Sequence, residues 1–475
     1  MHPANGANPP VQESHCFAMK DSLFNRRRFL AAGGCAIAAA PVVAWVPSAL
    51  AVQTGKPGSG TEPQQKMTLN VRDFGAAGDG SSKDTAALQQ ALDRCAALGG
   101  GVVQVPAGRY LTGSIALRTG TELRLEKGAT LQGSPDPADY AVTQVRWEGK
   151  WIQGHVGLVY AIDAERVCIT GPGQIAGDLE IGRRPTAQDP LRRPALIEFI
   201  RCRDLLLEGF STSYHHMWSI HPTGCENIVI RGLTIRSTGG NGDGIDLDSC
   251  RHVRIEGCDI STGDDCISLK SGRGEQGYTL HQPTEDVLIT DCTLADSIFA
   301  CIGIGSETSG GIRGVRIERC RFTHARSFAI YIKSRVGRGA YLEDISATDL
   351  DASGMEGGFL RLNLLSSGLL GEHPVRGAAG IPRCSNFHFS RVRVQDCPVL
   401  VQATNISAEK PLDGFVLENV SGTCEQGIFL ANVRNAQIRN LRVTGYAGPL
   451  ITAENVTGTG LGDARRLSPE ATQRP

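Results

Sequence analysis

A repeat that runs through most of the chain is the feature that most limits its fold. From about residue 123 onward, units such as DGIDLDSCRHVRIEG, AIYIKSRVGRGAYLEDI and FVLENVSGTC recur with a period of roughly 21 to 28 residues. Each unit holds two or three short strand-like segments separated by Gly, Ser, Asn or Asp. One such unit cannot bury its own apolar face, so successive units must stack. The sequence therefore predicts a solenoid of β-coils.

The solenoid predicts an all-β architecture, a parallel β-helix of about ten coils between residues 67 and 458. A propeller needs four strands in each repeat and a longer period, so it is the weaker alternative. Ahead of the repeat, residues 71–74 read as a strand. Residues 84–98 have the apolar spacing of a helix, with Asp84 as a candidate N-cap. A helix here would cover the open N-terminal end, where exposed strand edges invite aggregation.

Composition agrees with a turn-rich β protein and excludes some partners. The chain has 475 residues, of which 58 are Gly and only 5% are aromatic. Its formal net charge is −1, so no global positive field favours nucleic acid or an anionic membrane surface. We therefore expect neither as a partner.

The N-terminal segment predicts export. Asn25–Leu30 reads NRRRFL, which is a twin-arginine pattern, and a mildly apolar run leads to a small-residue cleavage site ending at Ala51. We assign residues 1–51 to a twin-arginine signal peptide, 52–66 to a polar linker and 459–475 to a polar tail. The apolar run is too short for a membrane anchor, so we expect a periplasmic or secreted protein.

The cysteines are predicted to be structural. Cys258, Cys292 and Cys320 each follow an inward-facing Ile by three residues, so they should stack as a buried ladder. A twin-arginine substrate folds before export in a reducing compartment, which disfavours disulfides. No CxxC pair is present in the sequence, so a zinc site is not expected.

Acidic residues recur at one phase of the repeat in NGDGIDLDSCRHVRIEGCDISTGDDCISLK, residues 241–270. Asp243 and Asp265 are 22 residues apart (265 − 243 = 22), so they occupy the same place in two successive coils. Stacked strands lie about 4.8 Å apart, which would gather both carboxylates with Asp264 at one turn. Such close like charges rarely serve stability and are typical of acid/base sites. Beside them we expect four outward-facing residues: Asp246, Asp248, Ser268 and Lys270.

Motifs in this region resemble those of a known family. NGDGIDLDSC followed by STGDDCISLKSG is similar to the Asn-Thr-Asp and Gly-Asp-Asp motifs of the polygalacturonase-like enzymes, glycoside hydrolase family 28. IGSETSGGIRGV and YIKSRVGRGAYLEDI resemble the two downstream motifs. The resemblance covers about residues 68–440. It implies a right-handed parallel β-helix that hydrolyses pectin-like or related polysaccharides, without a metal or other cofactor.

The resemblance also implies roles for individual residues. Asp264 would be the general acid, while Asp243 and Asp265 would hold and deprotonate the attacking water, with inversion at the anomeric carbon. Asn241 and Lys333 would contact substrate, the lysine at the sugar carboxylate. An inverting pair usually stands about 6.5–9.5 Å apart, so the acid-to-base distance must gain from the turn. We add three further candidates for substrate binding: Tyr331, Lys270 and Asp246.

The chain departs from the family pattern at a histidine. Where the family has Gly-His-Gly ahead of Ile-Gly-Ser, this sequence places Phe299 or Ala300 at the histidine. His216, one coil before Asp243 at the same phase, could replace it, and the favoured alternative is a structural role for His216.

The chain also departs at an arginine, because the family's Arg-Ile-Lys is Tyr331-Ile332-Lys333 here. Loss of a bidentate carboxylate ligand predicts that unsubstituted polygalacturonate is a poor substrate. Tyr331 would then stack on a neutral or differently substituted sugar. The alternative is that Tyr331 packs internally and an arginine such as Arg335 or Arg338 reaches in.

Two other functions fit the same residues. In a polysaccharide lyase the acidic cluster would bind Ca²⁺, and Lys270, Lys333 or Arg335 would be the base. The chain could also be a non-catalytic carbohydrate-binding solenoid. The interruptions at 271–283 and 365–382 are candidates for the walls of a substrate cleft. The sequence leaves the sugar, endo or exo action and the oligomeric state open.

Overall fold

A computed structural model describes residues 67–181, 190–214, 217–370 and 373–468. The predicted signal peptide and linker, His216 and the last seven residues of the predicted tail lie outside the described residues. The described chain belongs to one compact unit, Gln64–Pro475.

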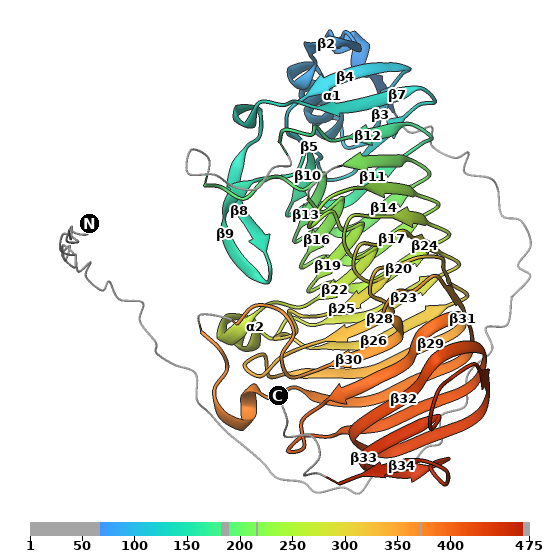
Figure 1. The fold of residues 1–475 in the computed structure, drawn as a ribbon. Helices are drawn as coiled ribbons and strands as arrows, with labels where there is room; N and C mark the ends of the chain where they lie inside the picture. The colour runs from blue at the N-terminus through green and yellow to red at the C-terminus, as the bar shows by residue number, and fades with distance from the viewer. Residues whose placement is uncertain (1–66, 182–189, 215–216, 371–372, 469–475) are drawn as a thin grey trace, which may run out of the picture. The chain divides into compact units, whose positions relative to one another are not determined.

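The fold is the right-handed parallel β-helix that the sequence predicts. Within the described residues, 32 strands pair in parallel, and Figure 1 shows them stacked from the blue N-terminal end to the red C-terminal end. Each coil contributes strands to three stacks. The first stack, which carries the predicted site, consists of β5 (Ile115–Ala116), β10 (Val159–Ile162), β13 (Ile197–Ile200), β16 (Ile220–Thr223), β19 (Ile245–Asp248), β22 (Ile267–Lys270), β25 (Ile302–Ile304), β28 (Phe328–Lys333) and β30 (Gly358–Asn363).

The other two stacks complete the coils. The second consists of β1 (Thr68–Asn70), β3 (Gly101–Val105), β6 (Thr121–Leu125), β11 (Glu165–Thr170), β14 (Arg203–Glu208), β17 (Glu226–Arg231), β20 (Arg251–Glu256), β23 (Thr284–Thr290) and β26 (Ile312–Glu318). The third consists of β2 (Asp79–Lys83), β4 (Gly108–Thr112), β7 (Ala129–Gly133), β12 (Gln174–Ala176), β15 (Ser211–Tyr214), β18 (Thr234–Ser237), β21 (Asp259–Ser261), β24 (Thr293–Ala295) and β27 (Arg321–Phe322). Four long strands run on through the C-terminal coils: β29 (Tyr341–Ser353), β31 (Arg383–Asn405), β32 (Leu412–Thr444) and β33 (Ile451–Thr459).

Asp and Asn residues let the second stack bend. Several of them have a positive φ, a conformation that these two residue types tolerate better than other L-residues. Asn227 donates from Nδ2 to Asp204 Oδ1 of the previous coil at 2.8 Å, and Asn386 donates to Asp344 at 2.9 Å. These residues lie inside strands such as β14 and β17, at positions that the register skips, so they form stacked bulges. The positive-φ positions of this series include one histidine, His252, besides Asp204, Asn227, Asp286, Asp344 and Asn386.

The core is a continuous column of apolar side chains inside the coils. In the first stack, one inward column runs through consecutive register partners: Ile197, Ile220, Ile245, Ile267, Ile302, Ile330 and Leu360. The predicted cysteine ladder is present, since Cys258, Cys292 and Cys320 are buried free thiols on successive coils. Stacking of the repeats thus buries these columns.

The N-terminal helix α1 (Thr85–Ala97) forms where it was predicted and packs Leu88 and Leu92 against the first coils. Asp84 precedes it, but its carboxylate makes no cap bond and instead accepts from the amides of Ala77 and Gly78, at 2.6 and 3.0 Å. The predicted strand at 71–74 is wrong. This segment is the 3₁₀ helix η1 (Val71–Phe74), because Asn70 Oδ1 accepts from Arg72 N and the left-handed Gly75 ends the turn.

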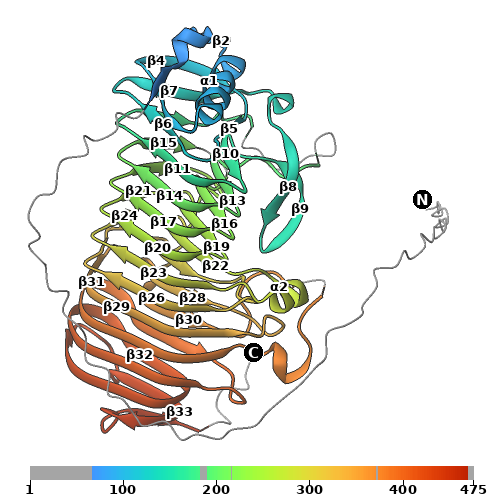
Figure 2. The same cartoon turned by 180° about the vertical axis from the view of Figure 1, so that it is seen from behind.

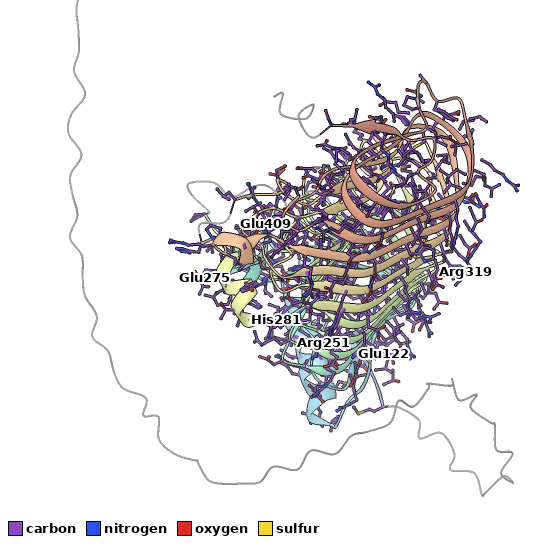
Figure 3. All side chains as sticks on the ribbon, turned by 90° about the horizontal axis from the view of Figure 1, so that it is seen from below. Glu122, Arg251, Glu275, His281, Arg319 and Glu409 are labelled. Carbon is purple, nitrogen blue, oxygen red and sulfur yellow. The ribbon has the colours of Figure 1, made fainter. Side chains whose placement is uncertain are left out.

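Three elements stand off the coils beside the first stack. They are the antiparallel hairpin of β8 (Val142–Trp147) and β9 (Lys150–His155), helix α2 (Gly274–Leu280), and a segment with the 3₁₀ helix η3 (Gly377–Gly380). Figure 2 shows the tip of the hairpin directed toward α2, and Arg273 N donates to Gly149 O at 3.1 Å. Figure 3 shows Glu275 of α2 and Arg319 on opposite sides of this unit. A further 3₁₀ helix, η2 (Pro137–Asp139), precedes the hairpin.

The C-terminal end differs from the predicted polar tail in one respect. Residues 465–467 form β34 (Arg465–Leu467), which pairs in parallel with β33, so the coils continue past residue 458. The backbone of the last coil has unpaired donors and acceptors that this short strand satisfies. Neither described α-helix has the length and apolar character that a membrane crossing requires.

Candidate active site

Asp243, Asp264 and Asp265 converge at one place on the first stack. Asp243 lies in the turn before β19, and the other two lie in the equivalent turn before β22. One carboxylate oxygen from each lies within 4.8 Å of the others. The turns sit this close because two glycines leave room for backbone. A Cβ on Gly244 would be 2.5 Å from Cys266 O, and one on Gly263 would be 2.3 Å from Gly239 N.

Asp265 is held on both oxygens. Its Oδ2 accepts from Lys333 Nζ at 2.8 Å, and its Oδ1 accepts from Ala300 N at 3.1 Å. The Lys333 ammonium also lies 4.6 Å from the ring centroid of Phe299, so an aromatic face covers it. Phe299 and Ala300, the two residues that the sequence offers at the position of the family histidine, therefore both contact this ion pair. Lys333 was predicted to contact substrate, but in this structure it binds Asp265.

In the described part of the chain, neither Asp243 nor Asp264 has an ion pair like that of Asp265 with Lys333. Asp264 is half-buried and accepts from Asn241 N at 3.1 Å and from Asp265 N at 3.0 Å. Asp243 is only 4% exposed, and its Oδ1 has no hydrogen-bond partner in the described part of the chain. Asp264 is thus the member of the trio most open to a ligand.

Burial raises the pKa of both Asp243 and Asp264, and the neighbouring carboxylates raise each pKa further. Burial by itself pushes the pKa of Lys333 down, but the Asp265 carboxylate outweighs it and the pKa is raised. The trio therefore combines a charged ammonium–carboxylate pair with two acids that hold a proton at higher pH than usual. Such a set can both donate a proton and accept one.

The raised pKa of Asp243 predicts that its carboxylate lowers the stability of the fold at neutral pH. Between about pH 4 and its raised pKa, the folded state binds more protons than the unfolded state, so stability falls as pH rises. We expect Asp243→Asn to raise Tm at pH 7, with the gain shrinking as pH falls toward 4. Thermal unfolding monitored by circular dichroism across this range measures it.

The matched control is Asp291→Asn, because Arg319 lowers the pKa of exposed Asp291 to about 2. That lowered pKa stabilises the fold above the usual Asp pKa, so the control should gain nothing at pH 7. A lower Tm for Asp243→Asn at every pH would show that the buried carboxylate does not destabilise the fold.

Asp246 and Lys270, two other predicted substrate contacts, bind each other. Asp246 Oδ1 lies 2.9 Å from Lys270 Nζ, and both side chains are buried. The ammonium also lies 4.6 Å from the ring centroid of Trp218. Asp246, Asp248, Ser268 and Lys270 face away from the core as expected, but other elements cover them, so they are not open surface.

The β8–β9 hairpin and residues 190–194 cover the coils on the N-terminal side of the trio. Arg146 of β8 bonds Asp248 at 2.8 Å, with both side chains almost fully buried. Arg193 donates to Asn241 Oδ1 at 2.8 Å, so the amide predicted to bind substrate is engaged. Every residue of β13, β16 and β19 is buried, including those that point outward. The hairpin and residues 190–194 therefore form an end wall beside the trio.

The predicted cleft-wall loops join this wall. Glu148 at the hairpin tip pairs with Arg273 of the first loop at 3.0 Å, and Glu275 N donates to His373 O of the second at 2.8 Å. Ser271 N donates to Glu307 O at 2.7 Å, which ties the first loop to the coil beside the trio. Both loops therefore border the site.

Comparison with known proteins agrees with this geometry. The model of the family described as Glycosyl hydrolases family 28 matches residues 95–357. The chain belongs to this family. The motif resemblance in residues 241–270 is thereby confirmed.

Individual relatives of the family 28 chain are moderately similar. A probable polygalacturonase of Vitis vinifera is 34% identical over 305 residues, covering 62% of this chain and 62% of its own length. An exo-poly-alpha-D-galacturonosidase of Dickeya chrysanthemi is 25% identical and is covered over 74% of its length. The chain spans 62% and 59% of the first two curated relatives that it matches.

Solved structures support the fold of this family 28 member. An exopolygalacturonase from Thermotoga maritima matches with a TM-score of 0.63 at 29% identity, over 83% of this chain and 92% of that one. A family 28 exopolygalacturonase of Yersinia enterocolitica matches with a TM-score of 0.72 at 21% identity, over 83% and 78%.

Tyr331 is a packing residue. Its side chain is 5% exposed, with the ring centroids of Phe299 and Phe328 at 5.6 and 6.3 Å. Its hydroxyl accepts from Asn363 Nδ2 at 3.3 Å. No ring face is left for a sugar, so the stacking role expected for Tyr331 does not fit this family 28 structure.

Neither arginine of the alternative prediction faces the trio. Arg338 is buried and donates to Ser306 O and Leu369 O, and Arg335 donates to Gly368 O. A third arginine, Arg361, follows Tyr331 by one coil in the same register and is half-buried. Sequence reasoning missed it, although the position of Tyr331 in the repeat points to it.

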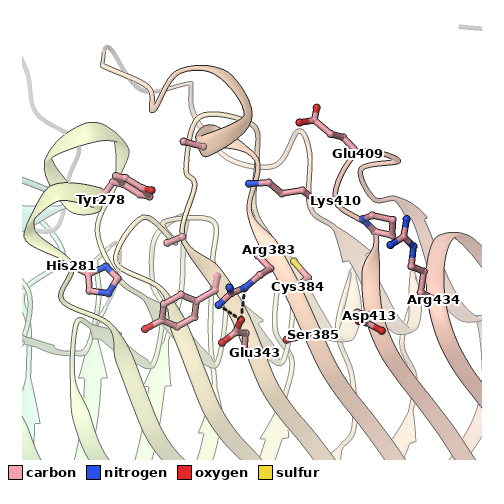
Figure 4. Close-up of a pocket in the computed structure, with 14 residues that line it drawn as sticks. Tyr278, His281, Glu343, Arg383, Cys384, Ser385, Glu409, Lys410, Asp413 and Arg434 are labelled. Atoms are coloured by element: carbon pink, nitrogen blue, oxygen red, sulfur yellow. Dashed lines mark hydrogen bonds and ion pairs between the residues drawn. The ribbon is translucent and has the colours of Figure 1, made fainter. Parts of the chain in front are cut away.

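A separate hollow lies beyond α2 on the C-terminal coils (Figure 4). Its volume is about 920 Å³, and it is lined in part by Tyr278, Tyr341, Lys410 and Arg434. Figure 4 shows Arg383 pointing to Glu343, with which it forms an ion pair at 2.6 Å. None of the predicted site residues lines it, so the acid/base chemistry belongs to the trio instead.

Proposed function

We propose that this family 28 protein is an exo-acting glycoside hydrolase that removes single sugars from the end of a pectin-like polysaccharide. The observation that carries the proposal is the position of the acidic trio against a closed end wall. On the N-terminal side of the trio the hairpin lies against the coils, with Arg146 buried against Asp248, so a polysaccharide cannot pass there. It would approach from the C-terminal coils, where Arg361 and Asn363 of β30 are half-buried. Relatives named as exo-acting galacturonosidases and exopolygalacturonases support this mode of action.

In the proposed mechanism Asp264 protonates the leaving oxygen. It is the most exposed of the three, and its raised pKa lets it keep the required proton at higher pH than an ordinary aspartate does. The water is held by Asp243 and Asp265, of which Asp265 carries the negative charge that Lys333 stabilises. Two hydrogen bonds of about 2.7–2.8 Å from one water span roughly 4.5 Å, which suits oxygens within 4.8 Å of each other.

The stereochemical part of the proposal is inversion. The nearest oxygens of the trio lie within 4.8 Å, closer than the roughly 6.5–9.5 Å typical of an inverting pair. The turn does not separate these oxygens as expected. For inversion, the sugar must lie between Asp264 and a water that bridges Asp243 and Asp265, so that the water attacks the face of the anomeric carbon opposite the leaving oxygen. The anomer released first, followed by proton NMR, tests this step, and a retained configuration would contradict it.

Exo action predicts a specific product pattern. Early digests of a pectic polysaccharide should contain one monosaccharide and a polymer that shortens slowly, because each binding event releases one terminal sugar. Chromatography of early time points and viscosity at equal bond cleavage measure this. A label at the reducing end records which end is attacked. Rapid loss of viscosity with a ladder of oligosaccharides would show endo action.

The lyase alternative has less support. The trio could hold a cation, but the Lys333 ammonium already neutralises Asp265 at 2.8 Å. The pKa values of Lys270 and Lys333 are raised, since pairing with Asp246 and Asp265 outweighs the opposing effect of burial. A lysine with a raised pKa is a poor base at neutral pH.

Export through the twin-arginine pathway remains part of the proposal, supported by NRRRFL at residues 25–30. Replacing Arg26 and Arg27 together by Lys should leave the protein in the cytoplasm. Fractionation of cells that express both forms tests this, and unchanged export of the double variant would refute it.

A further inference from the structure

Tyr331 stands where the family has an arginine, and the next coil carries an arginine, Arg361, at the same position. Gly303, Tyr331 and Arg361 are consecutive register partners on β25, β28 and β30. We propose that Arg361 binds the carboxylate of the sugar on the open side of the trio. It would make the protein selective for a uronate there. The inference rests on the proposed hydrolase function and names the substrate class of that site.

Aromatic rings orient the Arg361 guanidinium. Its central carbon lies 5.0 Å from the ring centroid of Tyr331 and 5.7 Å from that of Phe328. A guanidinium is weakly hydrated and stacks on aromatic faces while its N–H groups stay free to donate at the edge. Tyr331 therefore replaces the family arginine by a platform that carries an arginine from the following coil.

The guanidinium has no protein anion. In the described part of the chain it makes no hydrogen bond or ion pair, although it is half-buried. Other cations near the trio are engaged: Lys333 with Asp265, Lys270 with Asp246, and Arg146 with Asp248. Arg361 is thus the cation in this region that is free to bind an anionic ligand.

The distance between Arg361 and the acidic trio suits binding of the sugar next to the one that is cleaved off. Asp265 lies directly over Gly303, where a Cβ would be 2.2 Å from Oδ2. Coils rise by about 4.8 Å, so the Arg361 backbone lies roughly 10 Å from that of Gly303. This is about the length of two sugar residues, and the long side chain can reach back. The end wall lies on the N-terminal side of the trio, so the terminal sugar would bind against it. Arg361 would then contact the sugar on the leaving-group side of the bond that is cleaved.

A carboxylate is the group that matches this site best. The planar fork of a guanidinium donates two parallel hydrogen bonds to a carboxylate, whereas a neutral or methyl-esterified sugar offers no charge. A galacturonate-like residue on the open side is therefore favoured. This reverses the expectation from Tyr331 that unsubstituted polygalacturonate is a poor substrate.

The test compares Arg361→Gln and Arg361→Lys with the wild type on an oligogalacturonide and on its methyl ester. We expect Arg361→Gln to lose at least about tenfold in kcat/KM on the acid, mainly through KM, as for one charge-assisted hydrogen bond. Its kcat/KM on the ester should change little. Arg361→Lys should keep part of the activity on the acid, because it keeps the charge without the fork.

Arg316→Gln is the matched control, since Arg316 is exposed on the second stack and its nearest acid is 3.9 Å away. Equal losses on acid and ester in Arg361→Gln, or a wild-type preference for the ester, would overturn the inference while leaving the hydrolase proposal intact. No hydrolysis of either substrate by the wild type would instead refute the proposed function. Circular dichroism of each variant separates these results from misfolding, and if Arg361→Gln misfolds the Lys variant decides.

Discussion

Asp264→Asn is expected to lower kcat on a polysaccharide by roughly 10²–10⁴-fold, the usual contribution of general acid catalysis. Asparagine keeps the size of the side chain and can accept from Asn241 N as Asp264 does at 3.1 Å. It cannot supply the proton that the leaving sugar oxygen needs. Burial raises the pKa of Asp264, so this proton is available at higher pH than for an exposed aspartate.

The leaving group separates the roles of the aspartates. An activated aryl glycoside departs without a proton, so Asp264→Asn should lose much less activity on it. Asp265→Asn should harm both substrates alike, because water activation is needed for each. Rate should fall as pH rises through the raised pKa of the acid, and this alkaline limb should vanish in Asp264→Asn. Equal losses for both variants on both substrates would leave the acid unassigned, and unchanged activity would favour a binding module.

The sequence predicted the fold and the trio because both follow from the repeat. A period close to one coil fixes which residues stack, so Asp243 and Asp265 meet without any knowledge of distant contacts. The inward columns follow from alternation along each strand. The same local patterns place α1 almost to the residue. These features depend on near neighbours in sequence or on one coil of separation.

The sequence could not predict what covers the site. Arg146 meets Asp248 across 102 residues, and that pairing comes from a hairpin whose path no local pattern determines. Asn241 and Lys333 were assigned to substrate, but nearby Arg193 and Asp265 engage them. The predicted stacking of Tyr331 on a sugar does not fit the structure for a related reason. The burial of Tyr331 depends on Phe299, in the turn before β25 on the previous coil, and on Phe328, three residues earlier in its own strand, and alternation along one strand does not predict these ring contacts.

A large loss of kcat is also expected from Gly303→Ala, which adds a single methyl group beside Asp265. In Gly303→Ala the new Cβ would lie 2.2 Å from Asp265 Oδ2 and 3.1 Å from Lys333 Nζ. Both atoms end flexible side chains, so the side chains should move and the backbone should stay. Asp265 would then leave its contacts with Lys333 and Ala300. A displacement of about 1 Å at a reacting group can cost roughly 10²-fold in rate, so we expect a kcat loss of that order.

Stability should respond far less than activity, because the fold at Gly303 needs neither a positive φ nor a backbone contact at the Cβ position. Gly462→Ala is the control, since no atom lies within 4 Å of a Cβ there. The decisive comparison adds Gly303→Ala to Asp265→Asn. If the methyl acts only by displacing the Asp265 carboxylate, it should cost little once that carboxylate has been replaced. An undiminished loss in the double variant, or a collapse of Tm in Gly303→Ala alone, would show that the coil itself had shifted.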